Sequence, residues 1–116
     1  MELTLELVQR KLEKSPDVVY REVYCHEELI TLVAIENLVD GAKISEFIIE
    51  PLASYSEPVT DVDTLCREVL LASPAELVDS ADEAFEHLFS GCVLIFFSSF
   101  SEVIHCNVAG FVKRAV

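Results

Sequence analysis

The sequence predicts a single domain of mixed α/β type (α+β), in which helices pack on one mixed sheet of about four to five strands. Three observations lead to this fold class. At 116 residues the chain is long enough for one domain with its own core. Segments with helical spacing of apolar residues alternate with short runs of β-branched and aromatic residues. Nothing in the sequence repeats, and no linker rich in Pro, Gly or Ser divides it.

The predicted elements follow one another in the order α-β-β-α-α-β-α-β-β. They are a helix over about residues 2–14, strands Val18–Cys25 and Leu29–Ile35, helices after Asp40 and after Asp61, a short strand Ala75–Val78, a helix after Ser80, and strands Cys92–Phe97 and Val103–Ala109. One sheet covered by helices is the simplest architecture for this order.

Spacing and breaks define the first helix and the hairpin after it. Leu5, Val8 and Leu12 fall on one face of the helix. Pro16 ends this helix, because proline removes an amide donor and restricts the residue before it. The two strands that follow are separated only by the polar break His26-Glu27-Glu28, which is typical of an antiparallel hairpin.

Aspartate residues begin the two middle helices. Asp40 is a suitable N-cap for the first, and Asp61 for the second. The first helix has apolar residues at helical spacing, at Ile44, Phe47, Ile48 and Leu52. The second has them at Val62, Leu65 and Val69. We expect Pro51 to end or kink the first of these helices near its C-terminus.

The last third of the chain predicts a helix followed by the central strand. Ser80-Ala81-Asp82-Glu83 is a capping box, in which Ser80 caps the amide of Glu83 and Glu83 reaches back. Phe85 and Leu88 are expected to face inward, and Gly91 suits the C′ position. Cys92–Phe97 is apolar on both faces and is therefore the best candidate for a central strand.

The charge balance limits the partners of the chain. Eight Lys and Arg stand against 21 Asp and Glu, a formal net charge of −13. Such a domain repels phosphate backbones and anionic lipid heads, so we expect no nucleic acid and no direct membrane contact. The longest apolar run, Cys92–Phe97, is far shorter than the roughly 20 residues of a membrane helix, and no signal peptide is visible. The sequence predicts a soluble domain that is not secreted.

The apolar content is high for such an acidic domain. Apolar residues make up 52% of the chain, and mean hydropathy is +0.40. Either a sheet is covered on both faces, or some apolar surface is reserved for a neighbouring protein.

The four cysteines form no CxxC pair, and three of them sit in apolar runs or stripes, so they are interpreted as reduced core residues in a cytoplasmic setting. Cys25-His26 and His105-Cys106 together would make a Cys₂His₂ zinc set. However, adjacent residues on a strand point to opposite faces, so neither pair closes easily on one ion. Cys66 has Arg67 beside it, but its place in an amphipathic helix favours packing over nucleophilic catalysis. We expect no metal, no cofactor, no catalytic residue and no enzyme activity.

Asp61-x-Asp63 resembles the start of a calcium loop but lacks the glycine and the ligand that follow in such loops. The sequence also contains no P-loop, no G-x-G-x-x-G and no G-x-S-x-G motif, and it has only three glycines.

Three stretches of the sequence resemble the GerA-type spore germination proteins. Asn37–Leu52 is similar to that family's "GLVD…I.E.I..PL" segment, and Ser15–Glu22 is similar to its "S.D…R" pattern. Leu88–Phe97 and Gly110–Val116 together resemble its "LSG…LL" strand and "G…RAV" run. The resemblance covers about residues 15 to 116, in order and at consistent spacing.

This resemblance implies the A subunit of a germinant receptor, or its SpoVAF paralogue. Residues 1–116 would be the first of two soluble N-terminal subdomains on the cytoplasmic side of the spore inner membrane. The chain ends without a stop signal, which suggests that a longer membrane protein continues beyond it. The implied partners are the second subdomain and membrane region of the same chain, and the B and C receptor subunits. Phe111, Lys113 and Arg114 are the residues we expect at the subdomain interface.

Three functions remain open from the sequence. The first is a module that contributes to receptor or channel assembly and to signal relay during germination. The second is direct binding of a small-molecule germinant, such as an amino acid or a sugar, in a cleft. The third is an unrelated cysteine-dependent enzyme.

Overall fold

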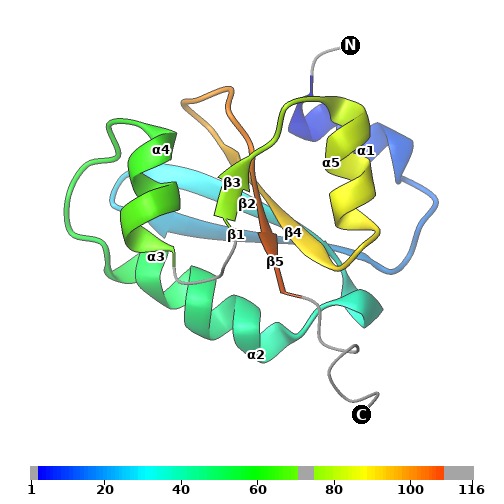
Figure 1. Ribbon diagram of the computed structural model, residues 1–116, viewed down its shortest axis with the longest axis horizontal. Helices are drawn as coiled ribbons and strands as arrows, with labels where there is room; N and C mark the ends of the chain where they lie inside the picture. The colour runs from blue at the N-terminus through cyan, green and yellow to red at the C-terminus, as the bar shows by residue number, and fades with distance from the viewer. Residues whose placement is uncertain (1–2, 71–74, 109–116) are drawn as a thin grey trace.

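The computed structural model describes residues 3–70 and 75–108, where a five-stranded sheet lies between two groups of helices (Figure 1). The strand order is β1-β2-β4-β5-β3, and every pairing between the described strands is antiparallel. The α+β fold class and the predicted order of elements are confirmed. The sheet is antiparallel rather than mixed, because β4, which the chain enters after α2–α4, β3 and α5, runs opposite to its neighbour β2.

The observed elements closely follow the predicted ones. The strands are β1 Val18–Cys25, β2 Glu28–Ile35, β3 Ala75–Leu77, β4 Cys92–Phe97 and β5 Ile104–Asn107. The helices are α1 Leu5–Lys11, α2 Gly41–Ile44, α3 Glu50–Ser54, α4 Val62–Thr64 and α5 Ala81–Leu88, with a 3₁₀ turn at Glu36–Leu38 and π-helical turns at Ser45–Ile49 and Leu65–Val69. The first helix is shorter than predicted, and the predicted strand end at Ala109 lies outside the described residues. No helix within residues 3–70 and 75–108 has the length and apolar character that crossing a bilayer requires.

The core forms one layer on each face of the sheet, as far as the described residues show. Helices α2, α3 and α4 pack on one face, and α1 and α5 pack on the other (Figure 1). Strand β4 serves both layers, because its side chains alternate. Val93 and Ile95 enter the first layer, whereas Leu94 and Phe96 enter the second. The prediction of a central strand that is apolar on both faces is therefore confirmed.

The aspartate caps of the two middle helices are confirmed. Asp40 Oδ1 accepts a hydrogen bond from the amide of Ala42 at 3.0 Å, and Asp61 Oδ1 accepts one from the amide of Thr64 at 2.7 Å. Each bond satisfies an amide at a helix start that has no partner within the helix.

Pro51 lies near the end of its helical segment, as predicted, but does not itself end it. The helical segment continues through Pro51 to Ser54, and a π-helical turn precedes it. In that turn the amide of Glu50 donates to the carbonyl of Ser45, five residues earlier. Pro51 stands in the first turn of α3, a position where the missing amide and fixed φ of proline are tolerated.

The capping box at α5 is confirmed with one change. Ser80 Oγ accepts from the amide of Glu83 at 3.1 Å, as predicted. The Glu83 carboxylate, however, accepts from the amide of Asp79 at 2.8 Å, one residue before the cap. Gly91 has φ 98°, so it adopts the left-handed conformation expected of a glycine, but it lies two residues after the C-cap Phe89 rather than one.

The β1–β2 hairpin has a tighter turn than the sequence predicted. Cys25 pairs with Glu28, so the turn consists of His26 and Glu27, and His26 has φ 62°. Glu28 is a buried strand residue, and its carboxylate accepts bonds from the loop after β4, at Ser98 Oγ and the Ser99 amide (3.0 and 2.8 Å). A carboxylate in a short polar break is usually an exposed turn residue. Glu28 is instead buried in β2, because hydrogen bonds from residues 70 and 71 positions later in the sequence satisfy its carboxylate.

The end of β5 is fixed by two backbone hydrogen bonds at Val108, a fully buried residue. The Val108 amide donates to the carbonyl of Gly91 at 3.2 Å, and the Val108 carbonyl accepts from the amide of Asp40 at 2.8 Å. Val108 therefore links the turn before β4 to the start of α2.

Candidate functional site

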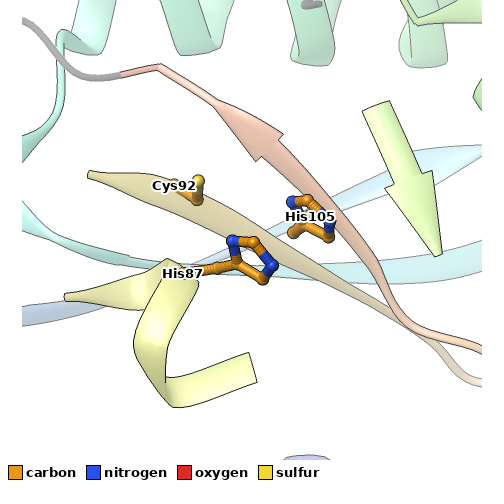
Figure 2. A group of neighbouring side chains, drawn as sticks. All are labelled: His87, Cys92 and His105. Carbon is orange, nitrogen blue, oxygen red and sulfur yellow. The ribbon is translucent and has the colours of Figure 1, made fainter. Parts of the chain in front are cut away.

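A cluster of two histidines and one cysteine lies beneath α5. His87 comes from the last turn of α5, Cys92 from the start of β4 and His105 from β5 (Figure 2). Together with the carboxylates of Glu76 and Glu83 at its edge, this group is called the His–Cys cluster below.

The β4–β5 register brings the two strand residues of the cluster together. Cys92 has the same parity as Leu94 and therefore points to the face of the sheet that α5 covers. Leu94 pairs with His105, so His105 is the diagonal cross-strand neighbour of Cys92 on that face. His87 reaches the same place from α5, which packs on this face through Leu88, and its ring stacks on that of His105.

The three side chains are close enough to share a small ligand. One donor atom from each residue can be chosen so that all three lie within 4.8 Å of one another. The imidazole rings of His87 and His105 are stacked, with centroids 3.7 Å apart and planes 8° apart. Cys92 and His105 are buried, whereas the side chain of His87 is 29% exposed.

Two nitrogens of the cluster are buried without a hydrogen-bond partner in the described part of the chain, His87 Nε2 and His105 Nδ1. The nearest carboxylate oxygens flank the rings. Glu83 Oε2 is 3.5 Å from His87 Nε2, and Glu76 Oε1 is 3.7 Å from His105 Nε2. Buried polar atoms normally have partners, so these two nitrogens require an explanation.

Burial disfavours the charged forms of His105 and Cys92. It lowers the pKa of His105, and the neighbouring His87 lowers it further, although the nearby carboxylates act in the opposite direction. Burial also raises the pKa of the Cys92 thiol. A neutral imidazole is a good metal ligand, whereas a thiol with a raised pKa is a poor nucleophile.

The other cysteines have the properties of core residues. Burial raises the pKa of Cys25, Cys66 and Cys106, the last to about 12. Cys66 Sγ donates to the carbonyl of Ala75 at 3.3 Å. These environments stabilise the thiol over the thiolate and give no support to a cysteine nucleophile.

The charged neighbours of Cys66 do not activate it. Arg67 Nε forms an ion pair with Asp63 at 2.8 Å, so both the guanidinium beside Cys66 and the second acid of the Asp61-x-Asp63 motif are engaged with each other. Both side chains of this pair are largely exposed.

The structure places the sequence-predicted candidates apart. Of Cys25, His26, His105 and Cys106, only His105 enters the cluster. Cys106 points to the opposite face of β5, into the layer under α2, α3 and α4. The suggested interface residues Phe111, Lys113 and Arg114 lie outside the described residues.

The sequence alone does not identify His87 and Cys92 as neighbours, because they form no recognisable motif with each other or with His105. The usable signal was a histidine in the last turn of a capped helix, followed five residues later by a cysteine at the start of an apolar strand. The contribution of His105 depends on the β4–β5 register, which the sequence alone does not give.

A separate cavity of about 320 Å³ opens near the start of α1. Apolar side chains such as Leu5, Leu29 and Phe100 line it. Glu22 and Ser101 are among its polar residues.

Comparisons with known proteins point to one family. Residues 6–116 match the family model described as the Bacillus/Clostridium GerA spore germination protein. Among solved structures, the fold is similar to the crystal structure of the N-terminal domain of the A subunit of the Bacillus megaterium spore germinant receptor GerK3, with a TM-score of 0.65 and 19% sequence identity. That alignment covers 91% of this chain and 45% of the other, so this chain spans less than half of that domain. No curated protein matches the sequence significantly.

Proposed function

Because the chain belongs to the GerA family of spore germination proteins, we propose that it is a module of a germinant receptor A subunit that contributes to receptor assembly and signal relay. The observation that carries this proposal is the family match over residues 6–116. The fold similarity to the N-terminal domain of GerK3 supports the A-subunit assignment.

We further propose that residues 1–116 are the first of two subdomains; coverage of 45% of the GerK3 domain leaves room for a second unit of similar size. Residues 1–116 would then be followed by a second subdomain and by membrane helices, with this module on the cytoplasmic side of the spore inner membrane. The partners would be those two regions of the same chain and the B and C receptor subunits. The reading frame after Val116 tests this arrangement, because it should encode a second polar region and then several long apolar spans. A stop codon at that point would contradict it.

Exposed apolar side chains at both edges of the sheet support a role in association. Tyr20 and Tyr24 are 39% and 63% exposed on the edge strand β1, and Leu77 is 40% exposed on the opposite edge strand β3. Phe89, at the end of α5, is 55% exposed. Sheet edges with exposed apolar residues are sites where other protein segments add. The raised pKa values of the cysteine thiols described above give no support to the alternative of a cysteine-dependent enzyme.

A subdomain-association assay tests the proposed interface at Phe111, Lys113 and Arg114. The chain would be titrated with the polypeptide encoded immediately downstream, and the affinity measured by calorimetry. We expect Lys113→Glu with Arg114→Glu to weaken association at low salt. The matched control is Lys11→Glu with Lys14→Glu, the same charge change at exposed positions around the end of α1. Equal affinity of both double variants would count against these interface residues.

Direct binding of a small germinant is the second candidate, favoured by the cavity near α1. Its volume of about 320 Å³ suits a small molecule, and Glu22 and Thr31 supply polar groups beside apolar walls. Calorimetric titration of the folded chain with amino acids and sugars tests it. Binding that is lost in Thr31→Val would support the cavity as the site. If no amino acid or sugar gives a heat of binding, direct germinant binding by this chain is ruled out.

A further inference from the structure

We propose that His87, Cys92 and His105 form a binding site for one thiophilic transition-metal ion of the zinc type. This site is independent of the receptor role, and it differs from the Cys₂His₂ set that the sequence suggested. It uses residues that the fold brings together from α5, β4 and β5 (Figure 2).

The donor types fit this class of ion. Imidazole nitrogen and thiolate sulfur are the preferred zinc ligands, whereas calcium and magnesium prefer oxygen. On binding, the Cys92 thiol would lose its proton to solvent and the sulfur would donate an electron pair to the ion. The resulting centre would carry a net charge of about +1 with two neutral imidazoles, and Glu76 and Glu83 at the edge supply compensating negative charge.

The distances require a small closure of the cluster. Zinc–sulfur bonds of about 2.3 Å and zinc–nitrogen bonds of about 2.0–2.1 Å place tetrahedral ligands about 3.3–3.6 Å apart. The three donor atoms now lie within 4.8 Å of one another, so their separations need to shorten by at most about 1.2–1.5 Å. The stacked rings have nearly parallel planes, so one ring has to rotate before both nitrogens point at the same ion. His87 is the residue that can rotate, because it lies at a helix end and is partly exposed.

The buried nitrogens without partners are the second observation that points to a ligand. His105 is 5% exposed, and its Nδ1 has no hydrogen-bond partner in the described structure. Its other nitrogen lies 3.7 Å from Glu76 Oε1, so a small movement of this exposed carboxylate would give the hydrogen bond that orients a metal-binding imidazole. His87 Nε2 likewise has no hydrogen-bond partner among residues 3–70 and 75–108, although Glu83 Oε2 lies 3.5 Å from it. Coordination would satisfy both nitrogens at once.

The fourth position of a tetrahedral site would be filled by water or by Glu83. Glu83 Oε1 is held by the Asp79 amide, which leaves Oε2 directed toward His87 at 3.5 Å. The carboxylate is thus fixed in place by a hydrogen bond of the helix start and needs little movement to approach the ion.

Titration of the reduced, chelator-treated chain with Co²⁺ and Zn²⁺ tests the proposal. We expect one ion per chain, a thiolate-to-Co²⁺ charge-transfer band in the near ultraviolet, and the intense visible bands of four-coordinate Co²⁺. Zn²⁺ should displace Co²⁺ and abolish both sets of bands. Absence of the charge-transfer band in the folded wild-type chain would overturn the site.

Matched variants identify the ligands. Cys92→Ser should abolish the charge-transfer band, whereas Cys66→Ser, which changes a buried cysteine of the other layer, should retain it. His87→Gln should weaken Zn²⁺ binding by more than about tenfold, and the exposed His26→Gln should leave it unchanged. His87 is partly exposed, so its variant tests the site even if Cys92→Ser does not fold. Equal effects of His87→Gln and His26→Gln, or loss of the band only in Cys66→Ser, would refute this ligand set.

Discussion

The buried carboxylate of Glu28 should contribute measurably to the free energy of unfolding, through its charge and its hydrogen bonds. Its Oε2 accepts hydrogen bonds from Ser98 Oγ at 3.0 Å and from the Ser99 amide at 2.8 Å, and these bonds tie the start of β2 to the loop after β4. Glu28→Gln keeps the size and an acceptor oxygen but removes the charge. Since a hydrogen bond to a charged group contributes about 1 kcal/mol more than a neutral one, we expect a loss of about 1–2 kcal/mol at neutral pH.

The pH dependence follows from the shifted pKa of Glu28. Burial opposes ionisation, but the hydrogen bonds from Ser99 and Ser98 outweigh it and lower the pKa of Glu28 below the ordinary value of 4.5. The folded state therefore binds this proton less tightly than the unfolded state. Its contribution to stability is fully present above the unfolded pKa and is lost as the pH falls through the lower folded pKa.

Urea unfolding followed by circular dichroism, at a series of pH values from neutral to acidic, measures this effect. The difference in unfolding free energy between wild type and Glu28→Gln should be constant near neutral pH and shrink in acid. At neutral pH the variant should also melt about 4–8 °C lower, because each kcal/mol corresponds to about 4 °C at this size. Glu27→Gln, at the exposed hairpin turn, is the control and should have little effect. A pH-independent difference, or an equal loss in Glu27→Gln, would refute the reasoning.

Further predictions concern α5 and the glycines, and the same unfolding assay checks each. Leu88→Ala should cost about 2–5 kcal/mol because Leu88 is fully buried, whereas Phe89→Ala, one residue on and 55% exposed, should cost far less; similar losses would contradict the assigned inward face. Ser80→Ala should cost about 1 kcal/mol through loss of the helix cap, with an unchanged free energy arguing that the cap contributes nothing. Gly91→Ala should destabilise by about 1 kcal/mol or more, because φ of Gly91 is 98°. Gly41→Ala should stabilise by about 0.5–1 kcal/mol, since a Cβ there meets no described atom within 4 Å. A stabilising Gly91→Ala together with a destabilising Gly41→Ala would contradict the backbone conformations of the two glycines.

Local chemistry explains why much of the fold could be predicted from the sequence. The strand Cys92–Phe97 was predicted with its observed bounds because six apolar residues in succession suit a strand covered on both faces. Asp40, Asp61 and Ser80 were identified as caps because a side-chain oxygen at a helix start satisfies an amide only a few residues away.

Features that depend on distant partners could not be predicted in this way. Glu28 resembled a turn residue because Ser98 and Ser99 meet it only after the sheet has formed. The continuation of the helix through Pro51 depends on a π-helical turn, which has no clear local signature. The His–Cys cluster likewise requires the β4–β5 register and the docking of α5, which spacing along the chain does not encode.

The hydrogen bonds of Val108 have a mechanical consequence. Any polypeptide that continues from β5 is attached to the domain at a residue held from two directions, by Gly91 and by Asp40. A force applied through that continuation would act first on two places, the start of α2 at Asp40 and the turn before β4 at Gly91. Gly91 is next to Cys92 in the chain, so strain entering the domain at this junction would reach the neighbourhood of the His–Cys cluster after a single peptide unit.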